Sequence, residues 1–125
     1  MGYYVEDIDF NLTIESKEQA LGCLHELMAR GKQYSWVSSS AVLDCISRGD
    51  IEEAFREWGY DLSPDLQLEG REREKWGDDE AFWKAIAPSV KKDSYIAFRG
   101  ECGALWRYIF TQHRLVEQAG TIHWE

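Results

Sequence analysis

The side chains that ligate metals or act as nucleophiles are few in this sequence and widely spaced. They are Cys23, Cys45, Cys102, His25, His113 and His123. A metal site requires several of them to converge on one point, but Cys23 and His25 lie two positions apart on a predicted helix and point to different faces. The chain also has no Cys-x-x-Cys pair and no glycine-rich phosphate loop. We therefore expect neither a metal ion nor a cofactor.

Catalysis by a nucleophile or by paired carboxylates has little support in the sequence. Cys102 follows Glu101, whose negative charge disfavours the thiolate that a cysteine nucleophile requires. The 23 acidic residues form many pairs, but no spacing singles one pair out. The sequence therefore favours a non-enzymatic protein, and a small enzyme of unknown reaction stays as an alternative.

The residues best suited to binding lie in SYIAFRGECGALWRYIF, residues 94–110. Two apolar runs, each containing an arginine, flank the Glu-Cys-Gly sequence at 101–103, which predicts a β-hairpin. A two-residue turn would give Cys102 a positive φ, which cysteine tolerates poorly. A type I turn followed by Gly103 in the left-handed conformation avoids that strain, and we expect this bulged turn.

The bulged turn fixes which side chains share a face, because a one-residue slip would send a whole strand's side chains to the other face. It pairs Gly100 with Ala104 and therefore Phe98 with Trp106. The side chains expected to face the helices are Ile96, Phe98, Trp106, Tyr108 and Phe110. Those expected on the outer side are Tyr95, Ala97, Arg99, Leu105, Arg107 and Ile109.

This outer side is the predicted working surface, because tyrosine and arginine are enriched at the energetic centres of interfaces. The candidate binding residues are Tyr95, Arg99, Leu105, Arg107 and Ile109, together with Tyr34 and Trp36 in the polar loop 32–40. One alternative is a solvated sheet face whose arginines bridge to Glu101 or Glu117, and another is a pocket for a small anion. Tyr34 and Trp36 could instead pack back onto the core.

The elements that must position these residues follow from periodicity and capping signals. Residues 3–14 predict a strand with Ile8, Phe10, Leu12 and Ile14 on the buried face. Helices are expected at 16–30, 40–48, from Asp50 toward Trp58, and from Asp78 or Asp79 to Pro88. Short strands are expected at 60–62 and 66–68, a solvated connection at 71–75, and strands near 94–100, 104–111 and 115–123.

This order predicts one α+β domain over residues 1–125. We expect an antiparallel or mixed sheet of about five to six strands with helices packed on one face, ending in a three-stranded meander.

Composition limits the partners. A formal net charge of −9 opposes binding to nucleic-acid phosphates, and the predicted helix at Asp50, Glu52, Glu53 and Glu57 is too acidic to read DNA. That same cluster makes an acidic mimic of nucleic acid an alternative function. No apolar run approaches the roughly 18 residues of a membrane span. The first residues do not show a signal-peptide pattern, so we expect a cytoplasmic protein with reduced thiols.

Four stretches carry a resemblance to a known group of proteins: MGYYVEDIDFNLTI, IEEAFREWGYDL, WGDDEAFWKAIAP and the hairpin sequence at 94–110. Together they resemble small uncharacterised acidic proteins of bacteriophages, plasmids and related bacterial mobile elements. The resemblance implies a cytoplasmic accessory protein that acts through contacts with a protein partner. By analogy, the partner would be a host defence or nucleic-acid-handling protein. A homodimer formed through the outer side is a further option.

Overall fold

Four α-helices and seven strands form in the part of the chain that the structure, a computed structural model, describes: residues 3–73, 75–112 and 114–120. The helices are α1 (Lys17–Ala29), α2 (Ser39–Ser47), α3 (Ile51–Glu57) and α4 (Asp79–Ile86), which runs into a short 3-10 turn, η1 (Ala87–Ser89). The strands are β1 (Tyr3–Asn11), β2 (Tyr60–Leu62), β3 (Leu68–Arg71), β4 (Lys75–Trp76), β5 (Tyr95–Gly100), β6 (Leu105–Thr111) and β7 (Arg114–Gly120). The predicted α+β class is confirmed.

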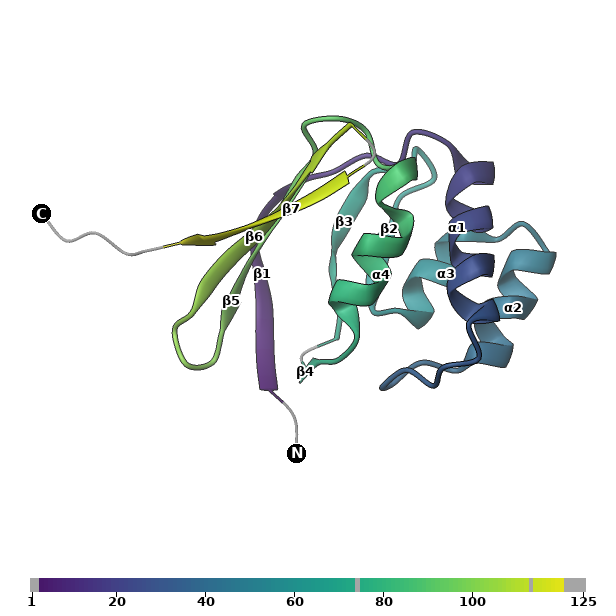
Figure 1. Ribbon diagram of the computed structural model, residues 1–125, viewed down its shortest axis with the longest axis horizontal. Coiled ribbons are helices and arrows are strands. Elements are labelled where there is room, and N and C mark those ends of the chain that lie inside the picture. Colours follow the sequence, from purple (N-terminus) through teal and green to yellow (C-terminus); the bar gives the residue numbers. More distant parts are fainter. Residues whose placement is uncertain (1–2, 74, 113, 121–125) are drawn as a thin grey trace, which may run out of the picture.

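Five of the strands form one antiparallel sheet in the order β4-β1-β5-β6-β7, and β2 and β3 form a separate hairpin. The predicted C-terminal meander is therefore present as β5, β6 and β7. Figure 1 shows the helices on one side of this sheet, with α4 nearest to it and α2 farthest away. No helix among the described residues covers the opposite side.

Aromatic side chains fill the core between the sheet and the helices. The ring of Phe82 in α4 stacks on Tyr60 and on Trp58, with centroid distances of 5.6 and 5.1 Å. Phe98 of β5 and Phe110 of β6 are fully buried from the sheet side. These large rings supply the apolar area that stabilises the fold.

The β5–β6 hairpin has the predicted register. Phe98 pairs with Trp106 and Ile96 pairs with Tyr108. Gly103 has a φ of +87°, and its N–H donates to the carbonyl of Gly100 at 2.9 Å, as a turn followed by a left-handed glycine requires. Ile96, Phe98 and Tyr108 are buried. Trp106 is only partly buried, stacked on Phe98 at 5.6 Å.

The predicted inward position of Ile8 is wrong, because β1 contains a bulge. Asp7 pairs with Phe98 and Asp9 pairs with Ala97, which leaves Ile8 as the extra residue. Val5 and Phe10 both pack against the core, although they are an odd number of positions apart. One inserted residue is needed to bring both inward, and Ile8 is consequently 45% exposed.

The predicted solvated connection at 71–75 is also wrong. Arg71 is the last residue of β3, its side chain is 1% exposed, and its Nε lies 3.1 Å from the Asp79 carboxylate. Its guanidinium also donates to the backbone carbonyls of Val5 and Lys75 at 2.9 and 2.7 Å. Lys75 belongs to β4 and pairs with Tyr4. The alternating charges therefore end one strand and begin another.

Candidate binding face

The side of the five-stranded sheet turned away from the helices is the candidate site, and we call it the outer face. Strand pairing places the following side chains on it: Lys75, Tyr4, Glu6, Ile8, Asp9, Asn11, Tyr95, Ala97, Arg99, Leu105, Arg107, Ile109, Thr111, Arg114, Val116 and Gln118. The five candidate residues from the C-terminal strands therefore share one surface. The sequence-based proposal did not include the residues that β1, β4 and β7 contribute.

The centre of the outer face is apolar. Ala97, Leu105 and Ile109 are each partly exposed there, and Ile8 and Val116 are 45% and 43% exposed. A hollow of about 220 Å³ opens on this face, and its lining includes Ile8, Ala97, Leu105, Arg107 and Gln118. Exposed aliphatic side chains grouped in this way are typical of contact surfaces.

Polar side chains surround this centre. Arg99 Nε donates to Glu6 Oε1 at 2.7 Å, and Arg107 Nε donates to Gln118 Oε1 at 2.9 Å. Neither arginine bridges to Glu101 or Glu117 among the described side chains. Arg99 is thus paired with a carboxylate, whereas Arg107 contacts only a neutral amide and remains available for intermolecular contacts.

Tyr95 has a fixed donor role on the outer face. Its hydroxyl donates to the Asp9 carboxylate at 3.2 Å. Partial desolvation, followed by the negative charge of Asp9, raises the pKa of Tyr95. The phenol therefore stays protonated near neutral pH and keeps the Asp9 carboxylate engaged.

A cation held between two exposed aromatic rings lies at the β4 margin of the outer face. The Nζ atom of Lys75 is 5.7 Å from the ring centroid of Tyr4 and 5.6 Å from that of Trp36. Both rings are about half exposed. Next to them is a hollow of about 550 Å³, whose lining includes Tyr4, Glu6, Arg99 and Glu101.

Trp36 is held in an unusual backbone conformation, with a φ of +65°, which costs a non-glycine residue energy. Its carbonyl accepts a 2.8 Å hydrogen bond from Arg73, and the amide of Ser35 before it donates to Asp78 at 2.8 Å. A Cβ on Gly77 would lie 2.9 Å from the indole. The loop thus presents a pre-ordered, exposed indole beside Lys75.

Tyr34, the other aromatic residue of this loop, is in the core. Its side chain is 7% exposed, and its ring centroid is 5.2 Å from that of Trp58. Of the predicted contact residues, the structure therefore places Trp36 beside the outer face and Tyr34 beneath the surface. The period-two exposure of residues 3–14 could have revealed Tyr4 and Glu6, but nothing local to the sequence indicated Lys75.

Cys102 contacts a tyrosine hydroxyl that the sequence did not suggest as its neighbour. The Tyr3 hydroxyl lies 2.6 Å from its Sγ atom. That hydrogen bond and one from the Ala104 backbone lower the pKa of the exposed Cys102 thiol and outweigh the opposing charge of Glu101. The expected direction of this shift was therefore wrong. Within the described residues, no group of three or more Cys, His, Asp or Glu side chains could hold a metal ion.

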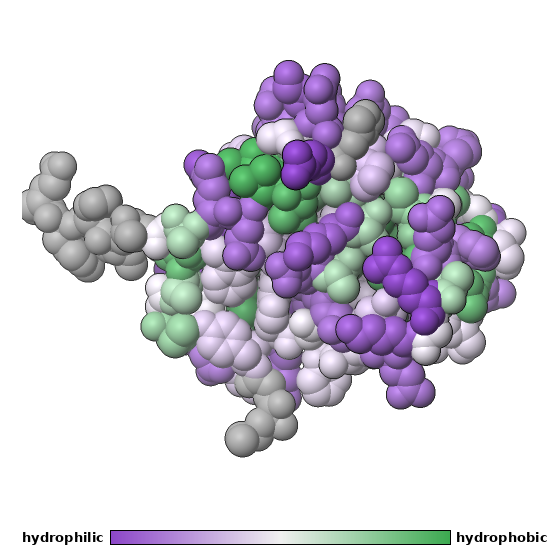
Figure 2. All heavy atoms as spheres, viewed as in Figure 1, coloured by the Kyte–Doolittle hydropathy of each residue, from purple (hydrophilic) through white to green (hydrophobic). Residues whose placement is uncertain are grey.

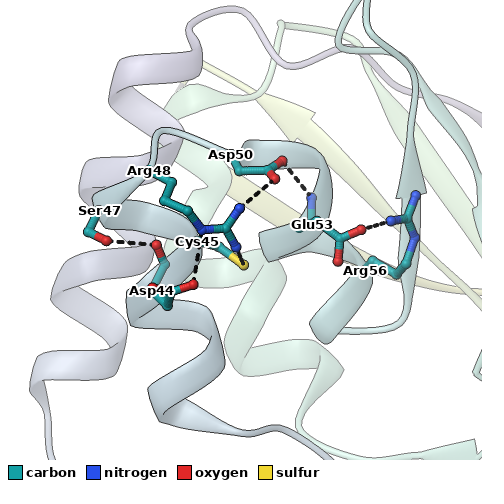
Figure 3. Close-up of polar contacts among 7 residues, drawn as sticks. All are labelled: Asp44, Cys45, Ser47, Arg48, Asp50, Glu53 and Arg56. Carbon is teal, nitrogen blue, oxygen red and sulfur yellow. Dashed lines mark hydrogen bonds and ion pairs between the residues drawn. The ribbon is translucent and has the colours of Figure 1, made fainter.

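The acidic helices, which motivated the nucleic-acid-mimic alternative, carry much of their charge in internal contacts (Figure 3). Arg48 bridges Asp44 and Asp50 at 2.9 and 3.2 Å. Asp50 also caps α3 by accepting the amide of Glu53 at 3.1 Å, and Glu53 pairs with Arg56. Hydrophilic residues dominate the surface over the helices (Figure 2). This surface has the character of an ordinary solvated one.

Comparisons with protein-family models, with curated proteins and with solved structures find no match. In the part of the chain that the structure describes, no helix is long and apolar enough to cross a membrane.

Proposed function

We propose that this chain is a non-enzymatic binding protein that recognises another protein through its outer face. The observation that carries the proposal is the uncovered side of the five-stranded sheet, where aliphatic side chains, two arginines and a tyrosine surround two hollows. Apolar area combined with directional donors is the chemistry of protein interfaces. Inhibition of a host defence or nucleic-acid-handling protein is the role that the resemblance favours.

The acidic helices support a function less well, because Arg48 and Arg56 neutralise several of their carboxylates. A mimic of nucleic acid needs free carboxylates at roughly phosphate spacing on one continuous surface. The outer face, in contrast, has both exposed apolar area and pre-ordered side chains.

The test is affinity capture from host extract with the tagged protein and two variants. Leu105→Asp places a charge in the apolar centre of the outer face. Leu43→Asp is the matched control, because Leu43 is 40% exposed on α2, in the helical layer. Proteins retained by the parent chain and by Leu43→Asp, but lost with folded Leu105→Asp, are the expected result. Equal retention by both variants, or no retention by the parent, would contradict the proposal.

A further inference from the structure

We propose that the outer face binds a short extended acidic segment of its partner, with carboxylates at both ends and apolar side chains between them. This inference rests on the proposed function and specifies the partner's chemistry. The basis is a charge asymmetry within the outer face: among the described residues, the carboxylates of this face already have partners, whereas Lys75 and Arg107 contact only neutral groups.

The carboxylates of the outer face are engaged within the chain. Glu6 accepts from Arg99, and Asp9 accepts from the Tyr95 hydroxyl. At the hairpin end, Glu101 Oε1 accepts the backbone amide of Tyr4 at 3.2 Å. A partner therefore finds no unoccupied carboxylate at these three positions, which lie on and beside the outer face.

Lys75 and Arg107 are two cations with neutral neighbours, and Arg114, opposite Thr111 at the β6–β7 turn, is a third cation on the outer face. Lys75 lies between the rings of Tyr4 and Trp36, and Arg107 donates to the amide oxygen of Gln118. Neither has a carboxylate partner among the residues that the structure describes. The rings order the Lys75 side chain before binding, which reduces the entropy that a contact must overcome. Both groups therefore remain able to pair with carboxylates from another molecule.

The positions of the two cations determine the length of the segment. Lys75 and Arg107 are on β4 and β6, with β1 and β5 between them. With strands about 4.8 Å apart and about 3.3 Å per residue along them, the two positions are about 20 Å apart on the diagonal. An extended segment spans that distance in about six residues. From Lys75 its path passes over the Glu6–Arg99 pair and reaches the apolar hollow lined by Ile8, Ala97 and Leu105 at the Arg107 end.

The overall charge favours a short acidic segment over nucleic acid. The chain has a formal net charge of −9. This charge repels a long polyanion such as nucleic acid more strongly than a short peptide with a few carboxylates. Carboxylates pair well with arginine in a two-point geometry, and the hollow offers apolar area that phosphates do not use.

The experiment is selection from a display library of random peptides long enough to cross the outer face, followed by affinity measurement on the selected peptides. We expect enrichment of peptides with Asp or Glu on both sides of an apolar centre. Lys75→Glu and Arg107→Glu should each weaken their binding by about tenfold, because like charges then face each other. Replacing one terminal carboxylate by lysine should restore binding to the matching variant.

Lys84→Glu is the control, since Lys84 is exposed on α4 and this variant changes net charge equally in the helical layer. Its affinity should match that of the parent. Neutral or basic selected peptides, no selected peptide, or equal weakening by Lys84→Glu would overturn the inference. So would an oligonucleotide or a second copy of the chain that binds in an Arg107-dependent way. If Leu105→Asp abolishes capture while both charge variants retain it, the proposed function stands and the acidic segment is rejected.

Discussion

The buried guanidinium of Arg71 joins parts of the chain that are distant in sequence. It pairs with Asp79 at the start of α4 and donates to the carbonyl of Val5 in β1. Asp79 also accepts from the Tyr60 hydroxyl at 2.6 Å. A buried charge is tolerated only when its hydrogen-bonding groups are satisfied. Here the Asp79 carboxylate accepts from Tyr60 in β2 and from Arg71 in β3.

Asp79→Asn should destabilise the protein by about 3–5 kcal/mol, because it leaves the charge of Arg71 buried without a counterion. The check is urea unfolding, with a lower midpoint at an unchanged m-value. Glu53→Gln is the control, since it removes an exposed ion pair with Arg56 and should cost less than about 1 kcal/mol. Equal losses for the two variants would show that burial adds nothing to the Arg71–Asp79 pair.

At the scale of elements, the β5–β6 hairpin depends on the left-handed conformation of Gly103. An added Cβ would meet nothing within 4 Å there, and the same holds for Gly22 in the middle of α1. Of these two glycines, Gly103 has a positive φ and Gly22 does not. Gly103→Ala should therefore cost about 1–2 kcal/mol, whereas Gly22→Ala should stabilise by about 0.5–1 kcal/mol. Thermal unfolding of both variants would reveal the opposite signs, and shifts of the same sign would reject this account of the turn.

The hairpin was predictable because its register follows from local chemistry: cysteine disfavours positive φ, glycine accepts it, and Phe98 then pairs with Trp106. The bulge at Ile8 was not predictable. It compensates for the odd number of positions between Val5 and Phe10, which both point inward, and this becomes evident only when β1 is paired with β5. The burial of Arg71 was not predictable either, because its partner Asp79 lies on another element and a local pattern of alternating charges resembles a solvated loop.

The candidate site divides in the same way. Tyr95, Arg99, Leu105, Arg107 and Ile109 were assigned together because one hairpin register determines all five. Lys75 and Tyr4 became part of the surface only through the order of strands in the sheet, which places β4 and β1 beside β5. Trp36 joins them through a loop conformation fixed by Arg73. Such long-range neighbours leave no periodic signal in the sequence.

At the scale of the whole molecule, stability should depend on alkaline pH through two buried tyrosines. Burial, followed by the charge of Asp79, raises the pKa of Tyr60 well above its usual value, and burial raises that of Tyr108, with Glu80 as the next cause. Each phenol therefore stabilises the fold fully below about pH 10, the pKa in the unfolded chain.

As pH rises above that value, each contribution should be lost at about 1.4 kcal/mol per pH unit, because the unfolded chain releases the proton first. Urea unfolding between neutral pH and pH 11 measures this decline. Tyr108→Phe, which lacks one titrating group, should show a shallower decline than the parent chain. A free energy of unfolding that stays constant up to pH 11 would rule out the assignment.

The position of β1 between β4 and β5 has a consequence for folding during synthesis. Asp9 and Tyr95 are hydrogen-bonded although they stand 86 positions apart. At a ribosomal rate of about 5–20 residues per second, β1 must wait about 4–17 s for β5, with which it forms its longer pairing. Glu6, Asp7 and Asp9 place three negative charges in this waiting strand. Charges in an unpaired strand oppose association with other nascent chains. The acidic residues of β1 should therefore reduce aggregation before the chain has folded.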